Sequence, residues 1–102
     1  MHDVNEENYP KLVEESDKTF ILKAGATWCA PCTASRGPFT ELAEELKDKF
    51  MLGEMDIDKS PNLGGKLFIR SVPVFFKIKN KKVVDQKVGW TNKDDLRKWI
   101  LS

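Results

Sequence analysis

Residues 26–32 read Ala26-Thr27-Trp28-Cys29-Ala30-Pro31-Cys32, and the elements on either side of this stretch decide the fold. The preceding run Phe20-Ile21-Leu22, with Ala24 and Ala26 after it, is apolar and too short for a helix, so it predicts a buried strand. On the other side, apolar residues recur at three- and four-residue steps between Phe39 and Phe50, which predicts an amphipathic helix. The two cysteines therefore lie where a strand passes into a helix.

This placement gives the two cysteines a chemical interpretation. Thiols three positions apart on the first turn of a helix can close into a disulfide ring and reopen. Cys29 would lie at the helix N-terminus, where free backbone N–H groups and the helix dipole favour the thiolate. Because the thiolate is the nucleophile of disulfide exchange, Cys29 is the expected attacking group and Cys32 the expected resolving thiol. The alternative, a pair of inert buried thiols, is disfavoured by the Cys-x-x-Cys spacing at such a junction.

Further strands are predicted from the distribution of apolar residues. One extends from about Met51 to Ile57. Two others, residues 74–78 and 83–88, are joined by a Lys-rich hairpin turn in which Asn80 is best suited to a left-handed conformation. A short strand is also predicted around Asp3–Val4.

Two other segments carry helical signals. Apolar residues at helical spacing over residues 9–13 predict a helix with Asn5 as its N-cap. Ser60-Pro61 predicts the start of a short helix near residues 62–68, because proline is favoured at the first helical position.

The C-terminal segment predicts the last helix. Thr91 followed three residues later by Asp94 resembles a capping box, and Leu96, Trp99 and Ile100 would form the buried face. The order of elements is then βαβαβαββα. Helices alternating with strands, followed by a hairpin, imply an α/β fold in which helices flank both faces of a central mixed sheet.

Length and composition exclude several classes of protein. The chain has 102 residues, so we expect a single domain over residues 1–102. Its net charge of +1 argues against a nucleic-acid-binding protein, and no apolar run is long enough to cross a membrane. With two cysteines and one histidine, His2, the chain lacks the ligands of a closed zinc site, so no metal is expected. The acidic N-terminus has no signal-peptide pattern, which favours a cytoplasmic location.

Together with these patterns, residues 26–32 resemble the active-site segment of the thioredoxin family, with Ala30 where the family usually carries glycine. The resemblance extends over almost the whole chain. It includes Pro38, Asp56-Ile57-Asp58, Ser60-Pro61, Ser71-Val72-Pro73 and Lys87-Val88-Gly89. It implies the thioredoxin fold, which agrees with the mixed sheet predicted above.

The resemblance also implies roles for individual residues. Cys29 would be the nucleophile and Cys32 the resolving thiol. Pro73 would be preceded by a cis peptide bond and would face the disulfide, so that the backbone of Val72 can pair with an extended substrate segment. The implied substrate groove consists of Trp28, Ala30, Pro31, Val72, Pro73, Gly89 and Trp90. For Trp90, packing against the C-terminal helix is an equally weighted alternative.

The function implied by the resemblance is reduction of disulfides in protein substrates by a monomer without a bound cofactor. Electrons would come from NADPH through a thioredoxin reductase, which gives the protein a part in electron transport and cell redox homeostasis. A glutaredoxin is disfavoured by Trp28 and Ala30-Pro31, and a disulfide-forming oxidant by the missing signal peptide. A binding clamp without redox activity would not need both Cys29 and Cys32.

Two departures from the family pattern stand out. Lys23 occupies the position of a buried aspartate and Glu54 that of its lysine partner, so the pair is reversed in sign but stays neutral. We hypothesise that Glu54, or Lys23 in its neutral form, exchanges a proton with Cys32; the alternative is a structural pair in which Lys23 reaches towards water. Pro38 also follows Cys32 by six residues instead of the family's usual five, so either Gly37 absorbs the extra residue or the helix kinks later.

Overall fold

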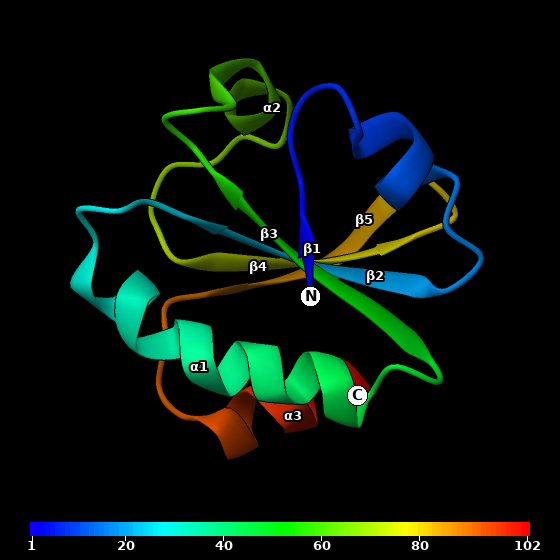
Figure 1. Ribbon diagram of the computed structural model, residues 1–102, viewed down its shortest axis with the longest axis vertical. Helices are drawn as coiled ribbons and strands as arrows, with labels where there is room; N and C mark the ends of the chain where they lie inside the picture. Colours follow the sequence, from blue (N-terminus) through cyan, green and yellow to red (C-terminus); the bar gives the residue numbers. More distant parts are fainter.

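Five strands form one mixed sheet in the order β1-β3-β2-β4-β5, as the computed structural model of residues 1–102 shows (Figure 1). The strands are β1 (His2–Asp3), β2 (Thr19–Gly25), β3 (Phe50–Asp56), β4 (Val74–Lys79) and β5 (Lys82–Val88). The helices are η1 (Pro10–Glu14), α1 (Ala30–Glu45), α2 (Pro61–Lys66) and α3 (Lys93–Leu101). β3 is parallel to both β1 and β2, whereas β4 is antiparallel to β2 and β5. The predicted order of elements and the α/β class are confirmed.

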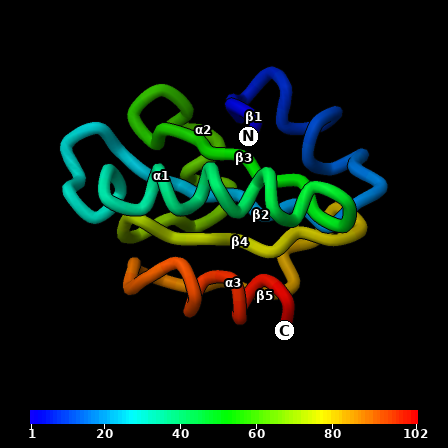
Figure 2. Tube along the Cα trace, turned by 60° about the horizontal axis from the view of Figure 1, so that its bottom comes forward, coloured from blue at the N-terminus to red at the C-terminus, as the bar shows by residue number.

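Helices cover both faces of this sheet. Figures 1 and 2 show α1 and α3 side by side along one face, where Phe39, Leu42 and Ile100 pack against Ile21 and Phe75 of the central strands. On the opposite face η1 and α2 contribute a second cluster, which contains Tyr9, Val13 and Leu63 together with Phe20, Leu22, Phe76 and Ile78 of the sheet. The central strand β2 is buried from Phe20 to Gly25 because both of its faces are covered. None of the helices has the length and apolar character required for a membrane span.

Helix α1 begins where the cysteine spacing predicted but ends earlier than the apolar stripe predicted. It begins at Ala30, well before the apolar stripe, because the Cys29 side chain caps its N-terminus and Pro31 lies in its first turn. It ends at Glu45, and Phe50 opens β3 instead by pairing with Thr19. Pro38 lies inside the continuous helix.

The N-terminal elements deviate slightly from the predictions. Strand β1 is His2–Asp3, one residue earlier than expected, and the Val4 N–H donates to the Glu54 carbonyl at 2.8 Å. The Asn5 side chain accepts N–H groups of Glu7 and Asn8, both at 2.9 Å, so it caps a turn. Helix η1 is a π-helix, which is wider than an α-helix, and it begins only at Pro10 with Tyr9 as its N-cap. The prediction of Asn5 as the N-cap is therefore wrong.

In the second half of the chain two local predictions are corrected and one is confirmed. Helix α2 ends at Lys66 and Phe68 lies beyond it, with a left-handed φ of 55°. Helix α3 is capped by Asn92, which accepts the Asp95 N–H at 2.9 Å, so the predicted capping box is shifted by one residue. In the hairpin turn, Asn80 has the expected positive φ.

Gly53 is required where β1 pairs with β3. A Cβ there would lie 2.8 Å from Phe20 Cζ and 2.9 Å from Val4 Cγ2. We therefore expect Gly53→Ala to lower the free energy of unfolding by about 1–3 kcal/mol, measured by urea denaturation. The matched control is Gly64→Ala within α2, where a Cβ meets nothing and should stabilise by about 0.5–1 kcal/mol. Equal effects of the two substitutions would contradict this account.

Candidate active site

Three loops meet at one end of the central strands. Figure 1 shows the segment before α1, the loop entering β4 and the end of β5 at this end of the sheet. The Val72–Pro73 peptide bond is cis, as the resemblance implied, and the Cys29 Sγ lies 3.7 Å from the Val72 carbonyl oxygen. The Gly89 N–H donates to the Pro73 carbonyl at 2.8 Å, which ties the end of β5 to the same place. The fold therefore gathers residues that are far apart in the sequence around Cys29.

The two cysteines form a disulfide at the N-terminus of α1. Cys29 is the N-cap residue, and its sulfur accepts the backbone N–H of Cys32 at 3.2 Å. Both cysteines are nearly buried, and they pack against Ala26. When the disulfide is reduced, the same N–H group and the helix dipole favour a thiolate on Cys29.

Exposed apolar side chains lie next to the disulfide. Trp28 is 68% exposed, yet its indole N–H donates to Asp58 Oδ2 at 2.8 Å, which fixes the ring at the surface. Ala30 and Pro31 are also exposed. Asp58 was part of the family motif, but its role as the partner of Trp28 was not predicted.

The other predicted groove residues are less exposed. Val72 and Gly89 are half-buried and Pro73 is buried. Trp90 is half-buried and packs against the cluster beneath α1 and α3, which is the alternative weighed for it in the sequence. Trp99 is likewise only partly buried, and its indole N–H donates to Asp85 at 3.1 Å.

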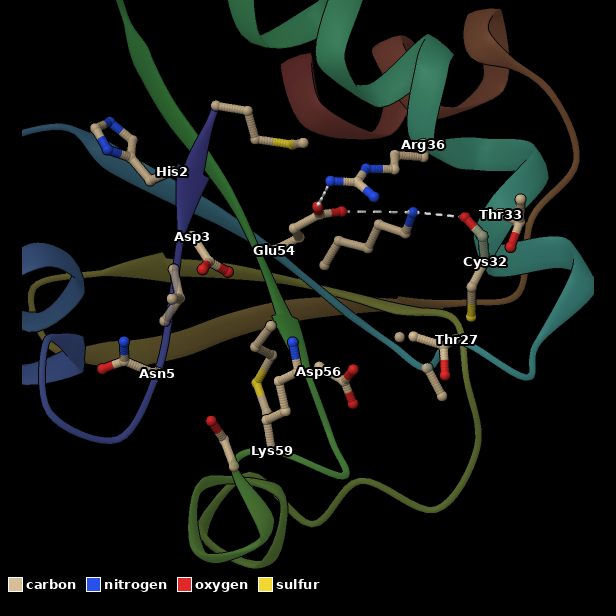
Figure 3. Close-up of a pocket in the computed structure, with 17 residues that line it drawn as sticks. His2, Asp3, Asn5, Thr27, Cys32, Thr33, Arg36, Glu54, Asp56 and Lys59 are labelled. Carbon is tan, nitrogen blue, oxygen red and sulfur yellow. Dashed lines mark hydrogen bonds and ion pairs between the residues drawn. The ribbon is translucent and has the colours of Figure 1, made fainter.

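The reversed charge pair and Cys32 line the same cavity, in which Figure 3 shows Glu54 close to Cys32 and Arg36. Lys23 and Glu54 are neighbours in the register of β2 and β3, with Lys23 Nζ 4.0 Å from Glu54 Oε2. Lys23 is 3% exposed, and its ammonium donates to the carbonyl oxygen of Cys32 at 2.7 Å. Lys23 therefore contacts Cys32 through a hydrogen bond, whereas it interacts with Glu54 through charge attraction alone.

Arg36 is a third member of this cluster that was not predicted. Its guanidinium lies 3.1 Å from Glu54 Oε1 (Figure 3). The signal was available in the sequence, because Arg36 follows Cys32 by four residues and so lies on the same face of α1. Glu54 therefore lies between a buried ammonium and an exposed guanidinium.

The environment of Lys23 weakens its hold on the proton. Burial lowers the pKa of the Lys23 ammonium below its ordinary value of 10.5. The Glu54 carboxylate opposes this shift, and Arg36 adds to it. Lys23 is thus a buried cation that is stabilised by one carboxylate and one backbone carbonyl.

A cavity of about 640 Å³ connects these groups, as Figure 3 shows. Cys32, Lys23, Glu54 and Arg36 line it. Gly25 lines it too, and a Cβ at Gly25 would lie 3.3 Å from Cys32 Sγ and 3.8 Å from Lys23 Cε. The glycine therefore keeps the space between the lysine and the sulfur open. The chain contains no cluster of three His, Cys, Asp or Glu side chains that could hold a metal ion.

Known proteins with similar sequences point to the same chemistry. The family model of thioredoxin matches residues 1–102. A thioredoxin from Chlorobaculum thiosulfatiphilum is 33% identical over 98 residues, which cover 96% of this chain and 91% of that protein. A thioredoxin from Rickettsia felis is 34% identical over 99 residues, which cover 97% of this chain and 94% of that protein. The chain therefore belongs to the thioredoxin family, and it carries that family's thiol–disulfide oxidoreductase chemistry in the Cys29–Cys32 pair.

Proposed function

We propose that the chain acts as a single domain that reduces disulfides of protein substrates, with Cys29 as nucleophile and Cys32 as resolving thiol. The observation that carries this assignment is the position of Cys29 at the N-terminus of α1. Its sulfur accepts the Cys32 N–H and faces the loop before β4. Cys32 lies one turn into the helix and faces the cavity that contains Glu54.

The reaction takes place in two exchanges. The Cys29 thiolate attacks one sulfur of the substrate disulfide, so that a mixed disulfide forms and the other substrate sulfur leaves as a thiolate. The Cys32 thiolate then attacks Cys29 Sγ, and the second substrate sulfur leaves. The substrate gains two electrons and two protons, and the protein ends with the Cys29–Cys32 disulfide.

Substrate binding is proposed at the exposed surface around Cys29. The groove consists of Trp28, Ala30, Pro31, Val72, Pro73, Gly89 and the exposed part of Trp90, whose remaining surface packs against the core. Neither backbone polar group of Val72 bonds to another backbone group, so both are free to pair with an extended substrate segment. The apolar surface of Trp28 supports contacts beside the disulfide that are independent of substrate sequence.

We further propose that Glu54 accepts the proton of Cys32 through the cavity that both residues line. Glu54 is the partly exposed member of the cluster, with a side chain 22% exposed, so it can pass the proton to water. Lys23 stays hydrogen-bonded to the Cys32 carbonyl, where its charge favours the Cys32 thiolate. A neutral Lys23 acting as the base is the competing assignment.

Substitution of Glu54 by glutamine tests this proton transfer. We expect Glu54→Gln to slow the resolution of a Cys29 mixed disulfide at pH 7 by about a hundredfold, with recovery at high pH, because a general base contributes this much at neutral pH. Single-turnover measurements across pH would record the profile, with Glu54→Asp as the conservative control. If Lys23→Met alone moves the profile, Lys23 is the base; if neither substitution moves it, the pair is structural.

The electron donor proposed for this cycle is a thioredoxin reductase that draws on NADPH, with the protein acting as a monomer in the cytoplasm. Membership of the family supports this arrangement, which would give the chain a part in electron transport and cell redox homeostasis. The test is reduction of insulin disulfides coupled to NADPH oxidation by a thioredoxin reductase. In a second assay with dithiothreitol as the reductant, insulin reduction that the protein does not accelerate beyond dithiothreitol alone would instead favour a binding clamp.

A further inference from the structure

Phe68 has a conformation that its side chain does not favour. It lies directly after Leu67, the C-cap of α2, with a φ of 55° and a side chain that is 84% exposed. The N–H of Phe68 bonds to the Gly65 carbonyl at 3.1 Å, and that of Ile69 to the Gly64 carbonyl at 3.0 Å. These two bonds form a Schellman motif, whose left-handed position is usually glycine. Neither the helix cap nor the core accounts for a phenylalanine here.

Phe68 borders a groove of about 670 Å³ that is lined mostly by hydrophobic residues. The opposite wall is the edge strand β5, whose Val83 and Val88 are 44% and 61% exposed. In the register of β4 and β5, these two valines lie beside the buried Ile78 and Val74, on the face that η1 and α2 cover elsewhere. The groove exists because those helices leave β5 uncovered. We call it the Phe68 groove and define it by Phe68, Arg70, Val83 and Val88.

The charges at the Phe68 groove all have one sign. Lys66 and Arg70 are the charged residues that line it, and no carboxylate does. Lys66 is paired with Glu14 at 3.5 Å, whereas Arg70 is exposed and makes no ion pair. In a chain with a net charge of +1, this is a local excess of positive charge beside apolar surface. Its complement is a segment with an acidic residue next to an apolar one.

The Phe68 groove adjoins the redox site. Phe68 lies four positions before Val72, whose carbonyl lies 3.7 Å from Cys29 Sγ, and four steps of extended chain span at most roughly 14 Å. At the other side, Val74 and Val88 line the groove immediately next to Pro73 and Gly89, which are joined by a hydrogen bond of 2.8 Å. A segment paired with the Val72 backbone can therefore continue into the groove within a few residues.

We propose that the Phe68 groove binds the part of a substrate protein that lies a few residues from the disulfide being reduced, and that it selects segments in which an acidic residue neighbours an apolar one. The inference rests on the proposed reduction of protein disulfides and names the substrate class. The exposed aromatic ring supplies the apolar contact, and Arg70 supplies the charge.

The test uses Phe68→Gly, for which stability and function should change in opposite directions. Glycine fits the left-handed position, so the midpoint of urea unfolding should rise. The kcat/KM for a peptide in which Asp-Leu lies a few residues from the disulfide should fall about tenfold, as for loss of an aromatic anchor. Reduction of cystamine, which has no flanking peptide, should not change. Val84→Ser is the matched control, because Val84 is 55% exposed on β5 but does not line the groove.

A second variant tests the selectivity. The wild-type protein should reduce the Asp-Leu peptide faster than a Lys-Leu peptide, and Arg70→Gln should shrink this ratio several-fold. An unchanged kcat/KM of Phe68→Gly for the Asp-Leu peptide would overturn the proposal. So would a dimer, seen by analytical ultracentrifugation, that Phe68→Gly dissociates without altering peptide kinetics, since a second copy would then occupy the groove. A wild-type protein that reduces neither the peptides nor cystamine would overturn the proposed function itself.

Discussion

Replacing either cysteine by serine should abolish turnover, but the two variants should fail at different steps. Cys29→Ser removes the attacking sulfur, so the rate of insulin reduction should fall by on the order of a thousandfold or more. Cys32→Ser keeps the attacking thiolate, so it should still form one mixed disulfide and then stop. The reason is that only Cys32 lies within one helical turn of the Cys29 sulfur, whose position the Cys32 N–H fixes at 3.2 Å.

The stalled complex is also the measurement. Cys32→Ser should accumulate disulfide-linked partners on Cys29 under oxidising stress, and mass spectrometry would identify them. The double variant Cys29→Ser/Cys32→Ser is the control and should capture none. Absence of any disulfide-linked partner on Cys32→Ser would count against the reductase, and residual turnover of Cys29→Ser would show that Cys29 is not the nucleophile.

The sequence predicted those features that local patterns determine. A short apolar run that is buried on both faces gave β2, and the cysteine spacing at its end gave the helix N-terminus and the disulfide. The spacing of Lys23 and Glu54 from the family motifs gave a pair that the parallel register of β2 and β3 brings together. These features follow from the periodicity of side chains and from a motif with a defined place in the fold.

The features that escaped prediction depend on contacts between residues distant in the sequence, or on residues whose backbone conformation is one that their type disfavours. Phe50 has the right spacing for the helix stripe, but pairing with Thr19 places it in β3. Arg36 is an exposed helical residue until β3 brings Glu54 to it. Phe68 occupies a position where propensity predicts glycine, and a residue that violates local preference cannot be found by rules built on that preference.

Lys23→Asp should be the most destabilising single change at the charge cluster. It would place a second carboxylate beside Glu54, at a site that is 3% exposed, and would remove the hydrogen bond to the Cys32 carbonyl. An uncompensated buried charge lowers the free energy of unfolding by about 3–5 kcal/mol, a large part of the roughly 5–15 kcal/mol of a typical domain. Urea denaturation would measure this loss. The loss should be smaller at pH 4 than at pH 7, because like-charge repulsion and burial raise the pKa of the new carboxyl and protonation then relieves both.

The decisive comparison is the exchange of both charges. Lys23→Asp/Glu54→Lys restores a neutral pair in the orientation usual for the family, so it should recover stability relative to Lys23→Asp alone. Recovery should be incomplete, because Arg36 lies 3.1 Å from the Glu54 carboxylate in the wild-type protein and would face a lysine in the exchanged variant. Adding Arg36→Gln should therefore stabilise the exchanged protein, whereas in the wild-type background the same substitution removes an attraction. If the exchanged pair is no more stable than Lys23→Asp alone, the two charges are not coupled and each acts on the fold by itself.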